Sequence, residues 1–303
     1  MATTTPVLIN VVGPTAIGKT KLAIKLATHF NTEILSADSR QFYKELSIGT
    51  AVPTPKELAA APHHFIQNRS ITEDYSVGAY EREGLEKLKS LFEHHNVVIA
   101  VGGSGLYIDA LNKGLNSFPK VDPKVKEEIA DKFAMQGIAY LQNELKITDS
   151  EYYNKVDLNN HTRLLRALEV SKTSGKPYSS FLNVEKEPRF FKSIYIGLMA
   201  DREVLYNRIN LRVDTMMVAG LLDEVKSVMA YRNHNALQTV GYKELFQYLD
   251  GELLLEEAIL EIKKNSRRYA KRQLTWFKRN PETIWVDFES PFSEILEKVK
   301  SAL

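Results

Sequence analysis

Gly13-Pro14-Thr15-Ala16-Ile17-Gly18-Lys19-Thr20 decides the fold of this chain, because it fits the pattern G-x-x-x-x-G-K-[ST]. The residues before it, Pro6–Val12, form a short β-branched run that is typical of a buried strand. The residues after it, Lys19–Phe30, carry apolar side chains at helical spacing. A glycine-bounded loop between an apolar strand and a helix is the setting in which this pattern binds phosphate, and we predict a phosphate site here.

The chemistry of such a loop follows from its backbone. The glycines let N–H groups turn inward around an anion, and the start of the helix adds the positive end of its dipole. Lys19 is expected to neutralise a terminal phosphate oxygen, and the Thr20 hydroxyl to ligate Mg²⁺, the expected cofactor. The predicted phosphate-binding residues are Gly13, Pro14, Thr15, Ala16, Ile17, Gly18, Lys19 and Thr20.

Strand and helix patterns alternate through the first hundred residues. Glu33–Ser36 predicts a second strand, Val77–His94 a helix, and Asn96–Val101 a central parallel strand. Ile48–Pro62, with three prolines, is expected to be a surface excursion. The alternation is typical of α/β proteins, and we predict a P-loop parallel sheet core with helices on both faces.

The pattern changes after about residue 116. Helical spacing occupies three stretches, Val125–Phe133, Tyr140–Leu145 and Arg163–Ser171. Gly175-Lys176-Pro177 should end the last of them. Strand character returns at Ile194–Met199, and nearly everything from Arg202 onward is expected to be helical. We therefore predict a core of residues 1–115 and 188–303, interrupted by a small all-helical insertion domain of residues 116–187.

The composition of the 303 residues is that of an ordinary globular protein, with 44% hydrophobic and 26% charged residues. The absence of cysteine excludes disulfides, thiolate zinc sites and cysteine nucleophiles. Because the formal net charge is only +2, any affinity for nucleic acid must come from a local concentration of Lys and Arg. Neither a secretion signal nor a membrane-spanning stretch is evident, and we expect a cytoplasmic protein.

The loop alone does not identify the phosphate compound. P-loop nucleotidases hold Mg²⁺ with a second acid at the end of an apolar strand. Here Val97–Val101 is followed by Gly-Gly-Ser-Gly, which argues against hydrolysis of a nucleoside triphosphate. An acid, Asp38, does follow the second strand, at the edge where a parallel sheet presents its ligands. Two alternatives remain: a small-molecule kinase with Asp38 as the base, or another group transfer in which diphosphate leaves.

A basic segment, Ile262–Arg279, contains no acid. On a helix, one side would form a packing seam of Ile262, Tyr269, Gln273 and Trp276. The other sides would carry Lys264, Arg268, Lys271 and Lys278. A solvated charged face is the ordinary explanation of such a run, but the interspersed acids that serve solubility are missing. We therefore expect phosphate contacts with a nucleic acid, which depend on salt and read no sequence.

Further motifs follow in order along the chain. They are Asp38-Ser39-Arg40-Gln41-Phe42-Tyr43, Ile48-Gly49-Thr50-Ala51-Val52-Pro53, His63-His64-Phe65-Ile66, Val101-Gly102-Gly103-Ser104-Gly105-Leu106-Tyr107, Arg163-Leu164-Leu165-Arg166-Ala167-Leu168-Glu169-Val170, Ser174-Gly175-Lys176-Pro177, Gly220-Leu221-Leu222-Asp223-Glu224-Val225, Thr239-Val240-Gly241-Tyr242-Lys243-Glu244 and Ala270-Lys271-Arg272-Gln273-Leu274-Thr275-Trp276-Phe277-Lys278. Together with the loop, this set resembles the tRNA dimethylallyltransferases, also called isopentenyltransferases. An ordered set from Gly13 to Lys278 is far more specific than a P-loop alone.

The family transfers the dimethylallyl group of dimethylallyl diphosphate to N6 of the adenosine 3′-adjacent to the anticodon, position 37 of tRNA, and releases diphosphate. The resemblance implies this reaction here, with tRNA and dimethylallyl diphosphate as partners. Lys19, the loop amides and Mg²⁺ would neutralise the departing diphosphate. Arg212 resembles the family arginine that assists the diphosphate, and Asp38 would accept the proton of the adenine amine. Ser104 stands where the family usually has Thr.

The resemblance also implies contacts with tRNA, whose target base must leave its stack and enter a channel. The implied tRNA-binding residues are Asp38, Ser39, Arg40, Gln41, Ser104, Lys126, Thr162, Arg163, Leu164, Leu165, Arg166, Gln238, Thr239, Val240, Gly241, Tyr242, Lys243, Lys271, Arg272, Gln273, Leu274, Thr275, Trp276, Phe277 and Lys278. Read from the residues alone, Arg163 and Arg166 either hold the anticodon stem or belong to a salt-bridged surface. His63 and His64 would point to opposite faces of a strand, which argues against a shared metal.

Three positions depart from the family pattern. Gln67 stands where an acid commonly follows the two histidines, Asn160 replaces an acid before the helix of Arg163, and Ser104 replaces the usual Thr. Two further alternatives are prenylation of free adenine nucleotides, which the insertion and the basic segment disfavour, and an RNA-binding P-loop module without catalysis. We expect a monomer, because the basic face and the channel already use much of the surface.

Overall fold

The computed structural model describes residues 5–182, 184 and 186–303. The chain forms two compact units, of which the first contains the residues up to Lys113 together with Arg189–Leu303. The second contains Gly114–Pro188. The division expected from sequence, at residues 116 and 187, lies close to these boundaries. Across the described ranges, no helix combines the length and the hydropathy needed to cross a membrane.

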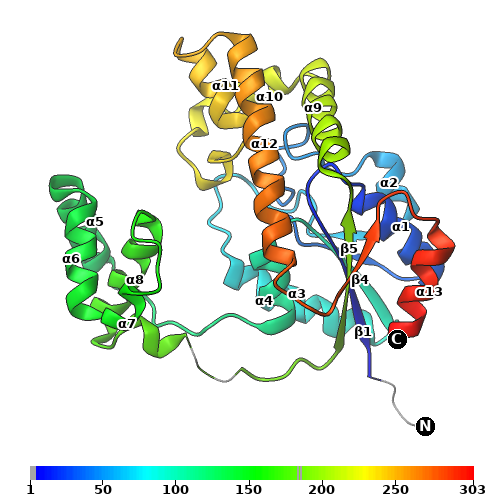
Figure 1. Cartoon of the computed structure of the whole chain (residues 1–303), viewed down its shortest axis with the longest axis horizontal. Helices are drawn as coiled ribbons and strands as arrows, with labels where there is room; N and C mark the ends of the chain where they lie inside the picture. Colours follow the sequence, from blue (N-terminus) through cyan, green and yellow to red (C-terminus); the bar gives the residue numbers. More distant parts are fainter. Residues whose placement is uncertain (1–4, 183, 185) are drawn as a thin grey trace. The chain divides into compact units, whose positions relative to one another are not determined.

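In the described part of the first unit, six strands form one parallel sheet with the order β3-β2-β4-β1-β5-β6 (Figure 1). The strands are β1 (Val7–Val12), β2 (Ile34–Ser36), β3 (His63–His64), β4 (Val97–Val101), β5 (Lys192–Met199) and β6 (Thr283–Asp287). In the centre, Ile9 of β1 pairs with Ile99 of β4 and with Ile194 of β5. Because parallel strands end at one edge, the segments that follow β1, β2 and β4 gather there.

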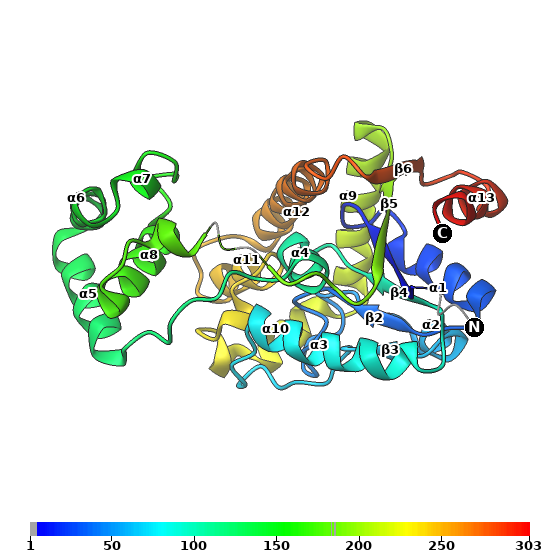
Figure 2. The ribbon, with the colours of Figure 1, turned by 90° about the horizontal axis from the view of Figure 1, so that it is seen from below.

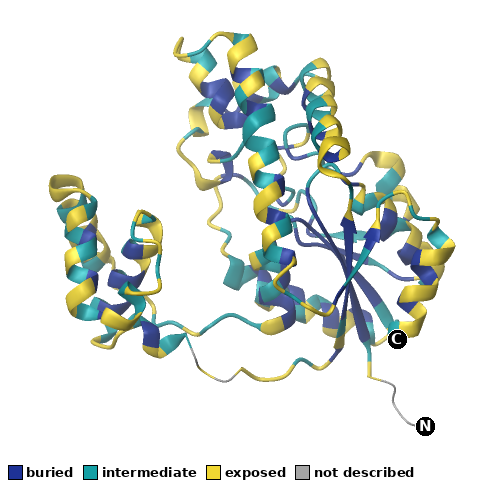
Figure 3. Ribbon diagram, viewed as in Figure 1, coloured by how far each residue is buried: buried dark blue, intermediate teal, exposed yellow. Residues whose placement is uncertain are grey.

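Helices cover both faces of this sheet, which confirms the predicted fold class (Figure 2). One face packs against α1 (Lys19–Phe30) and α13 (Phe292–Ala302), and the other against α3 (Val77–Phe92) and α4 (Gly105–Lys113). Alternate residues of β1 serve the two cores, because successive side chains of a strand point to opposite faces: Ile9 lies in the first core and Leu8 in the second. The central strands β1, β2 and β4 are accordingly buried over nearly their whole length, whereas the edge strands β3 and β6 are partly exposed (Figure 3).

A third core joins four helices of the first unit. They are α9 (Arg202–Val218), α10 (Leu221–Ser227), α11 (Tyr242–Leu249) and α12 (Leu255–Phe277). Val213, Leu221, Leu245 and Ile262 contribute one buried side chain from each helix. This helical layer holds α9 and α12 beside the carboxyl edge of the sheet, where both line a cavity.

One sequence-based expectation was wrong in detail, and another gains a feature that the sequence did not predict. The stretch after Arg202 contains a strand, β6, which pairs with β5 at the edge of the sheet and was overlooked because it is short and follows a long helix. The proline-rich excursion contains a helix, α2 (Pro55–Ala60). Thr54 and Glu57 form a capping box at its start, and Pro55 occupies its first turn, where a proline costs no hydrogen bond.

The described part of the second unit contains helices and no strand, as expected for the insertion. The helices are α5 (Pro123–Gln136), α6 (Ile138–Thr148), α7 (Ser150–Tyr153) and α8 (His161–Ser174), followed by a 3₁₀ turn, Tyr178–Phe181. Their common core contains Ile129, Leu141, Leu145 and Leu168. Gly175 ends α8 with a left-handed φ of 70°, as its sequence predicts.

Candidate active site

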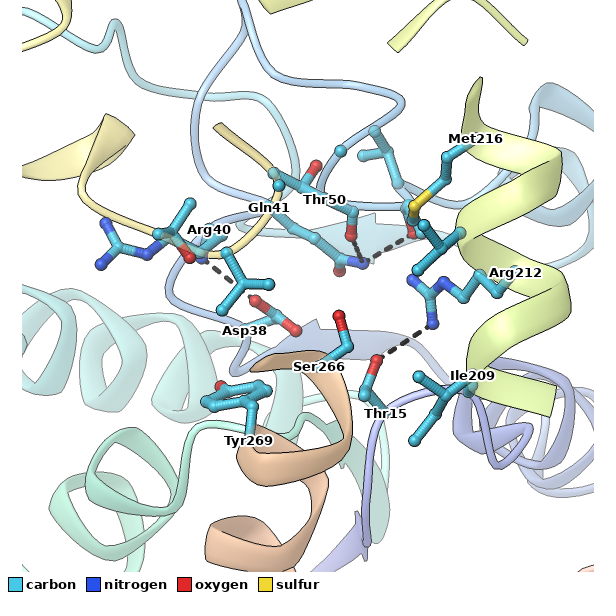
Figure 4. A pocket seen from close by; sticks show the side chains of 18 of the residues that line it. Thr15, Asp38, Arg40, Gln41, Thr50, Ile209, Arg212, Met216, Ser266 and Tyr269 are labelled. Carbon is cyan, nitrogen blue, oxygen red and sulfur yellow. Dashed lines mark hydrogen bonds between the residues drawn. The ribbon is translucent and has the colours of Figure 1, made fainter. Parts of the chain in front are cut away.

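The loops at the carboxyl edge of the sheet enclose a cavity of about 1370 Å³ (Figure 4). It is lined by the phosphate loop, by the segment that follows β2, and by α9 and α12. Ordinary small-molecule pockets measure roughly 300–1,000 Å³. The cavity therefore has room for more than one small reactant.

The phosphate loop has the backbone that its glycines predict. Gly18 precedes α1 with φ 106°, a conformation that L side chains rarely adopt, and α1 has no side-chain cap. The amides of its first turn are consequently free to bind an anion. Lys19 Nζ donates to the carbonyl oxygen of Pro14 over 2.8 Å and so folds back over the loop. Thr20 lines the same cavity.

Three cations surround this loop. Arg212 of α9 donates from Nη1 to the Thr15 hydroxyl over 3.2 Å, and Arg208, one turn earlier, donates from Nε to the Ala16 carbonyl over 2.9 Å. Burial lowers the pKa of Lys19 to about 8, against the attraction of Asp38 and together with the repulsion of Arg212. Burial also lowers the pKa of Arg212 from its ordinary value, again opposed by Asp38. Sequence reasoning missed Arg208, although its i, i+4 spacing from Arg212 was a usable signal.

Asp38 faces these cations across the cavity (Figure 4). Its Oδ1 accepts a hydrogen bond of 3.1 Å from the backbone N–H of Arg40, which fixes the carboxylate at the end of β2. Arg40 in turn donates to the carbonyl of Asn235 over 2.7 Å. The arrangement thus places a carboxylate opposite a cationic phosphate loop, as required for a base and a leaving-group site in one cavity.

Two hydroxyl residues lie beside Asp38. Ser104 is buried; its Oγ accepts from the Ser39 N–H over 3.0 Å and lies 3.1 Å from the Ser39 Oγ. Tyr269 of α12 lines the cavity, and burial raises its pKa to about 12, with Asp38 adding to the effect. Tyr269 was expected in a packing seam; its place in the cavity wall makes it a candidate contact for substrate.

The Gly102–Gly105 segment follows β4, at the place where P-loop nucleotidases carry a second acid. In this chain its glycines make room for α12. A Cβ at Gly103 would lie 2.2 Å from Gln273 Nε2, and one at Gly105 would lie 2.2 Å from Trp276 Cδ1. The Trp276 indole N–H donates to Asp109 over 2.8 Å. Close approach of a helix explains these glycines, and the segment offers no metal-binding carboxylate.

Among the remaining residues implied for tRNA binding, six are exposed and three have buried side chains. Gln238 and Lys243, and on α12 Lys271, Arg272, Thr275 and Lys278, are exposed. Tyr242 and Phe277 lie in hydrophobic cores, and Gln273 is 5% exposed. Leu274 packs against the first core. Neighbouring helices and loops cover the side chains of Tyr242, Gln273 and Phe277. The implied contacts of these three residues with tRNA stay predictions.

Two lysines of the basic segment form ion pairs within the protein, which makes them less available to phosphate groups. Lys263 forms an ion pair of 2.6 Å with Asp214, and Lys264 pairs with Glu261, which lies just outside the acid-free stretch. The exposed cations are Arg268, Lys271, Arg272, Lys278 and Arg279. The positive surface of α12 consequently lies toward its C-terminal half.

In the second unit, Lys126, Thr162, Arg163 and Arg166 are exposed, whereas the Leu164 side chain is fully buried in the helical core. The implied contact of Leu164 with tRNA stays a prediction. Leu165 packs against that core. Arg166 lies 4.0 Å from Glu169 and 5.4 Å from the centre of the Phe118 ring. A 4.0 Å pair on a helix surface is weak, so this salt bridge leaves Arg166 able to meet another anion.

The positions that depart from the family pattern have local roles. Asn160 caps α8 by accepting from the Arg163 N–H over 3.2 Å, a task that Asn and Asp perform about equally. Gln67 donates to the Lys44 carbonyl and, over 2.8 Å, to the Ser47 hydroxyl, which an ionised acid cannot do.

The two histidines have separate partners. His63 Nδ1 lies 2.7 Å from the Ala61 carbonyl, and His64 Nε2 lies 2.5 Å from Glu33. Burial lowers the pKa of His63. Different partners for the two rings agree with the expectation that adjacent strand residues point to opposite faces.

Comparisons with known proteins agree with this geometry. A family model described as IPP transferase matches residues 41–280. The chain is 55% identical over 296 residues to a tRNA dimethylallyltransferase of Christiangramia forsetii, with 98% of each chain covered. It is also 55% identical to a tRNA dimethylallyltransferase of Flavobacterium johnsoniae, over 98% of this chain and 99% of the relative.

Solved structures lead to the same family. A tRNA isopentenylpyrophosphate transferase from Bacillus halodurans matches with a TM-score of 0.72 at 35% identity, over 99% of this chain and 95% of that one. A eukaryotic dimethylallyltransferase acting on tRNA matches with a TM-score of 0.81 at 27% identity, over 93% of this chain and 74% of that one. The chain therefore belongs to the IPP transferase family of tRNA dimethylallyltransferases.

Proposed function

We propose that the protein transfers the dimethylallyl group of dimethylallyl diphosphate to N6 of adenosine 37 of tRNA and releases diphosphate. One observation carries this proposal: Lys19, Arg212 and Asp38 share one cavity, and their charges influence each other. The cations meet the requirement of a diphosphate leaving group, and the carboxylate meets that of an amine that must lose a proton.

In the proposed reaction, the adenine N6 lone pair forms a bond to C1 of the allylic group while the C1–O bond breaks. The electron pair of that bond leaves with diphosphate, whose growing charge is stabilised by the loop amides, Lys19 and Arg212. The N6 proton passes to Asp38, which the Arg40 N–H holds at the sheet edge. The hydroxyl of Ser104 lies beside this edge and can orient the acceptor.

The residues also fit a magnesium ion carried by the diphosphate. Within the residues that the structure describes, no three His, Cys, Asp or Glu side chains gather into a metal site. Mg²⁺ commonly keeps several waters and takes only one or two protein ligands beside phosphate oxygens. Thr20, at the start of α1, would supply one such oxygen. When bound, Mg²⁺ would add positive charge next to the leaving group.

An assay with labelled dimethylallyl diphosphate tests the proposal. The purified chain is incubated with the donor and with either unmodified tRNA or AMP, and labelled ATP replaces the donor in a third arm. We expect label in tRNA at adenosine 37, none in AMP, and no phosphate transfer from ATP. Label in AMP alone would establish nucleotide prenylation, and label in neither acceptor would favour an RNA-binding module.

The proposal includes a monomer that acts in the cytoplasm. The phosphate loop, the cations and the carboxylate that line the cavity all come from one chain. Sedimentation of the protein with and without tRNA tests this part, and a dimer that persists at low concentration would contradict it.

A further inference from the structure

Gln273 occupies an unusual place for a residue of a basic helix. Its side chain is 5% exposed, and it points away from solvent toward the carboxyl edge of the sheet. Its Oε1 accepts from the backbone N–H of Thr15 over 2.8 Å, and its Nε2 donates to the carbonyl of Gly103 over 2.8 Å. One amide group thereby connects α12, the phosphate loop and the segment that follows β4.

Each end of this bridge leads to a reactive part of the cavity. Thr15 is held a second time, through its hydroxyl, by Arg212. Gly103 immediately precedes Ser104, which binds Ser39 next to Asp38. The bridge therefore joins the leaving-group side of the cavity to the base side through groups that are covalently adjacent to both.

The fit between the Gln273 amide and Gly103 is tight. Gly103 must lack a side chain, because a Cβ there would lie 2.2 Å from Nε2. The Gln273 amide is buried, and a buried amide that loses its partners carries a desolvation cost. The bridge is consequently sensitive to any movement of α12 that separates Gln273 from the two loops.

We propose that Gln273 is a positioning residue that couples the RNA-facing helix α12 to the diphosphate loop. The donor site is fully formed only when α12 packs against the loop, so that Gln273 binds Thr15 and Gly103. This rests on the proposed function. The physical basis is that Gln273 fixes the Thr15 peptide and thus the loop that receives the diphosphate. The exposed Lys271 and Lys278 on the same helix are the groups that RNA would engage.

The test compares Gln273→Met with the wild-type chain and with Lys271→Met. Methionine keeps the length and packing of glutamine but lacks both hydrogen-bonding groups. Calorimetry with dimethylallyl diphosphate and Mg²⁺, without tRNA, should show donor affinity reduced about tenfold in Gln273→Met, the effect of about 1.4 kcal/mol expected for two lost hydrogen bonds. Its tRNA affinity, measured without donor, should stay within about threefold. Lys271→Met should instead lower the affinity for tRNA and leave the affinity for the donor unchanged.

Gly103→Ala provides a second, independent test with Gln273 intact. The new methyl group would displace the amide from its two partners. We expect the same loss of donor affinity, and no further loss when Gln273→Ala is added. This variant keeps the inference testable if Gln273→Met does not fold.

Three outcomes would overturn the inference. They are tRNA affinity lost with donor affinity kept, a lower melting temperature with both affinities kept, and additive losses in the double variant. The first would make Gln273 an RNA contact and the second a purely structural residue. A wild-type chain that binds no donor at all would instead refute the proposed function, so the two failures are distinguishable.

Discussion

Two glycine-rich segments follow neighbouring strands of this sheet, and they are glycine-rich for different reasons. In Gly13–Thr20, which follows β1, Gly18 is required by its backbone: φ is 106°, and no atom lies within 4 Å of a Cβ built there. In Gly102–Gly105, which follows β4, Gly103 and Gly105 are required by space, because side chains of α12 occupy the position of a Cβ. The backbone of the first segment suits the anion site that we propose, and the absence of side chains in the second leaves space for α12.

The largest effect should come from Asp38, which lies across the cavity from the first segment and beside the second. Asp38→Ala removes the carboxylate that we propose as the acceptor of the N6 proton, and a general base contributes about 10²–10⁴-fold to rate. We expect single-turnover transfer to fall by about 10³-fold, with tRNA affinity within a few-fold of wild type. A large loss of tRNA affinity in filter binding would mean that Asp38 is chiefly a binding residue.

The pH dependence of donor binding tests the phosphate loop. Lys19 has a pKa of about 8 in the free protein, and only its charged form attracts diphosphate. Donor affinity should therefore be constant below pH 8 and decrease by up to about tenfold for each pH unit above it, because the bound state must take up a proton. Calorimetric titrations between pH 7 and 10 measure this slope.

Lys19→Arg is the matched control for the pH profile, because a guanidinium stays charged throughout that range. The variant should lose the decrease above pH 8, whatever its absolute affinity. An identical slope in Lys19→Arg would assign the titration to another group.

Alanine substitutions separate the two glycine-rich segments. Gly18→Ala should lower the free energy of unfolding by about 1–3 kcal/mol, the cost of an unfavourable backbone region. Gly105→Ala should cost a similar amount through overpacking against Trp276. Thermal denaturation of both variants measures these losses.

A compensating change then distinguishes strain from crowding. Trp276→Ala, although costly by itself, should make Gly105→Ala nearly neutral when the two are combined, and it should leave the cost of Gly18→Ala unchanged. Rescue of Gly18→Ala, or no rescue of Gly105→Ala, would contradict the comparison.

The smallest effect concerns the insertion. Asn160→Asp should change stability by less than about 0.5 kcal/mol, because both residues cap a helix equally well, whereas Asn160→Ala should cost about 1 kcal/mol. A strongly stabilising or destabilising Asp, measured by denaturant unfolding, would show that the missing acid has a role beyond the cap.

The sequence predicted those parts of the molecule that depend on local pattern. The phosphate loop, the strand before it and the helix after it follow from glycine spacing and hydrophobic periodicity, and α1 spans the predicted Lys19–Phe30. Asp38 was placed at the sheet edge because parallel strands share one edge. The strand β6 was missed because Thr283–Asp287 is not a continuous apolar run like Val97–Val101, and its place depends on pairing with β5.

Contacts between segments that lie far apart in the sequence could not be predicted from it. Helical spacing placed Gln273 in a packing seam, but nothing local indicates that its amide binds Thr15 and Gly103. Arg208 and Tyr269 likewise reach the cavity only because α9 and α12 pack beside the sheet. Spacing along a helix predicts which residues share a face of that helix. Only the packing of α9 and α12 against the sheet determines which face lines the cavity.

A crystal structure with an unreactive analogue of dimethylallyl diphosphate, and a parallel soak with ATP, tests the central claim most directly. We predict the analogue's diphosphate within Gly13–Thr20, in contact with Lys19 and Arg212, and its allylic carbon turned toward Asp38. ATP well ordered in the loop, with the five-carbon analogue bound nowhere near it, would contradict the account.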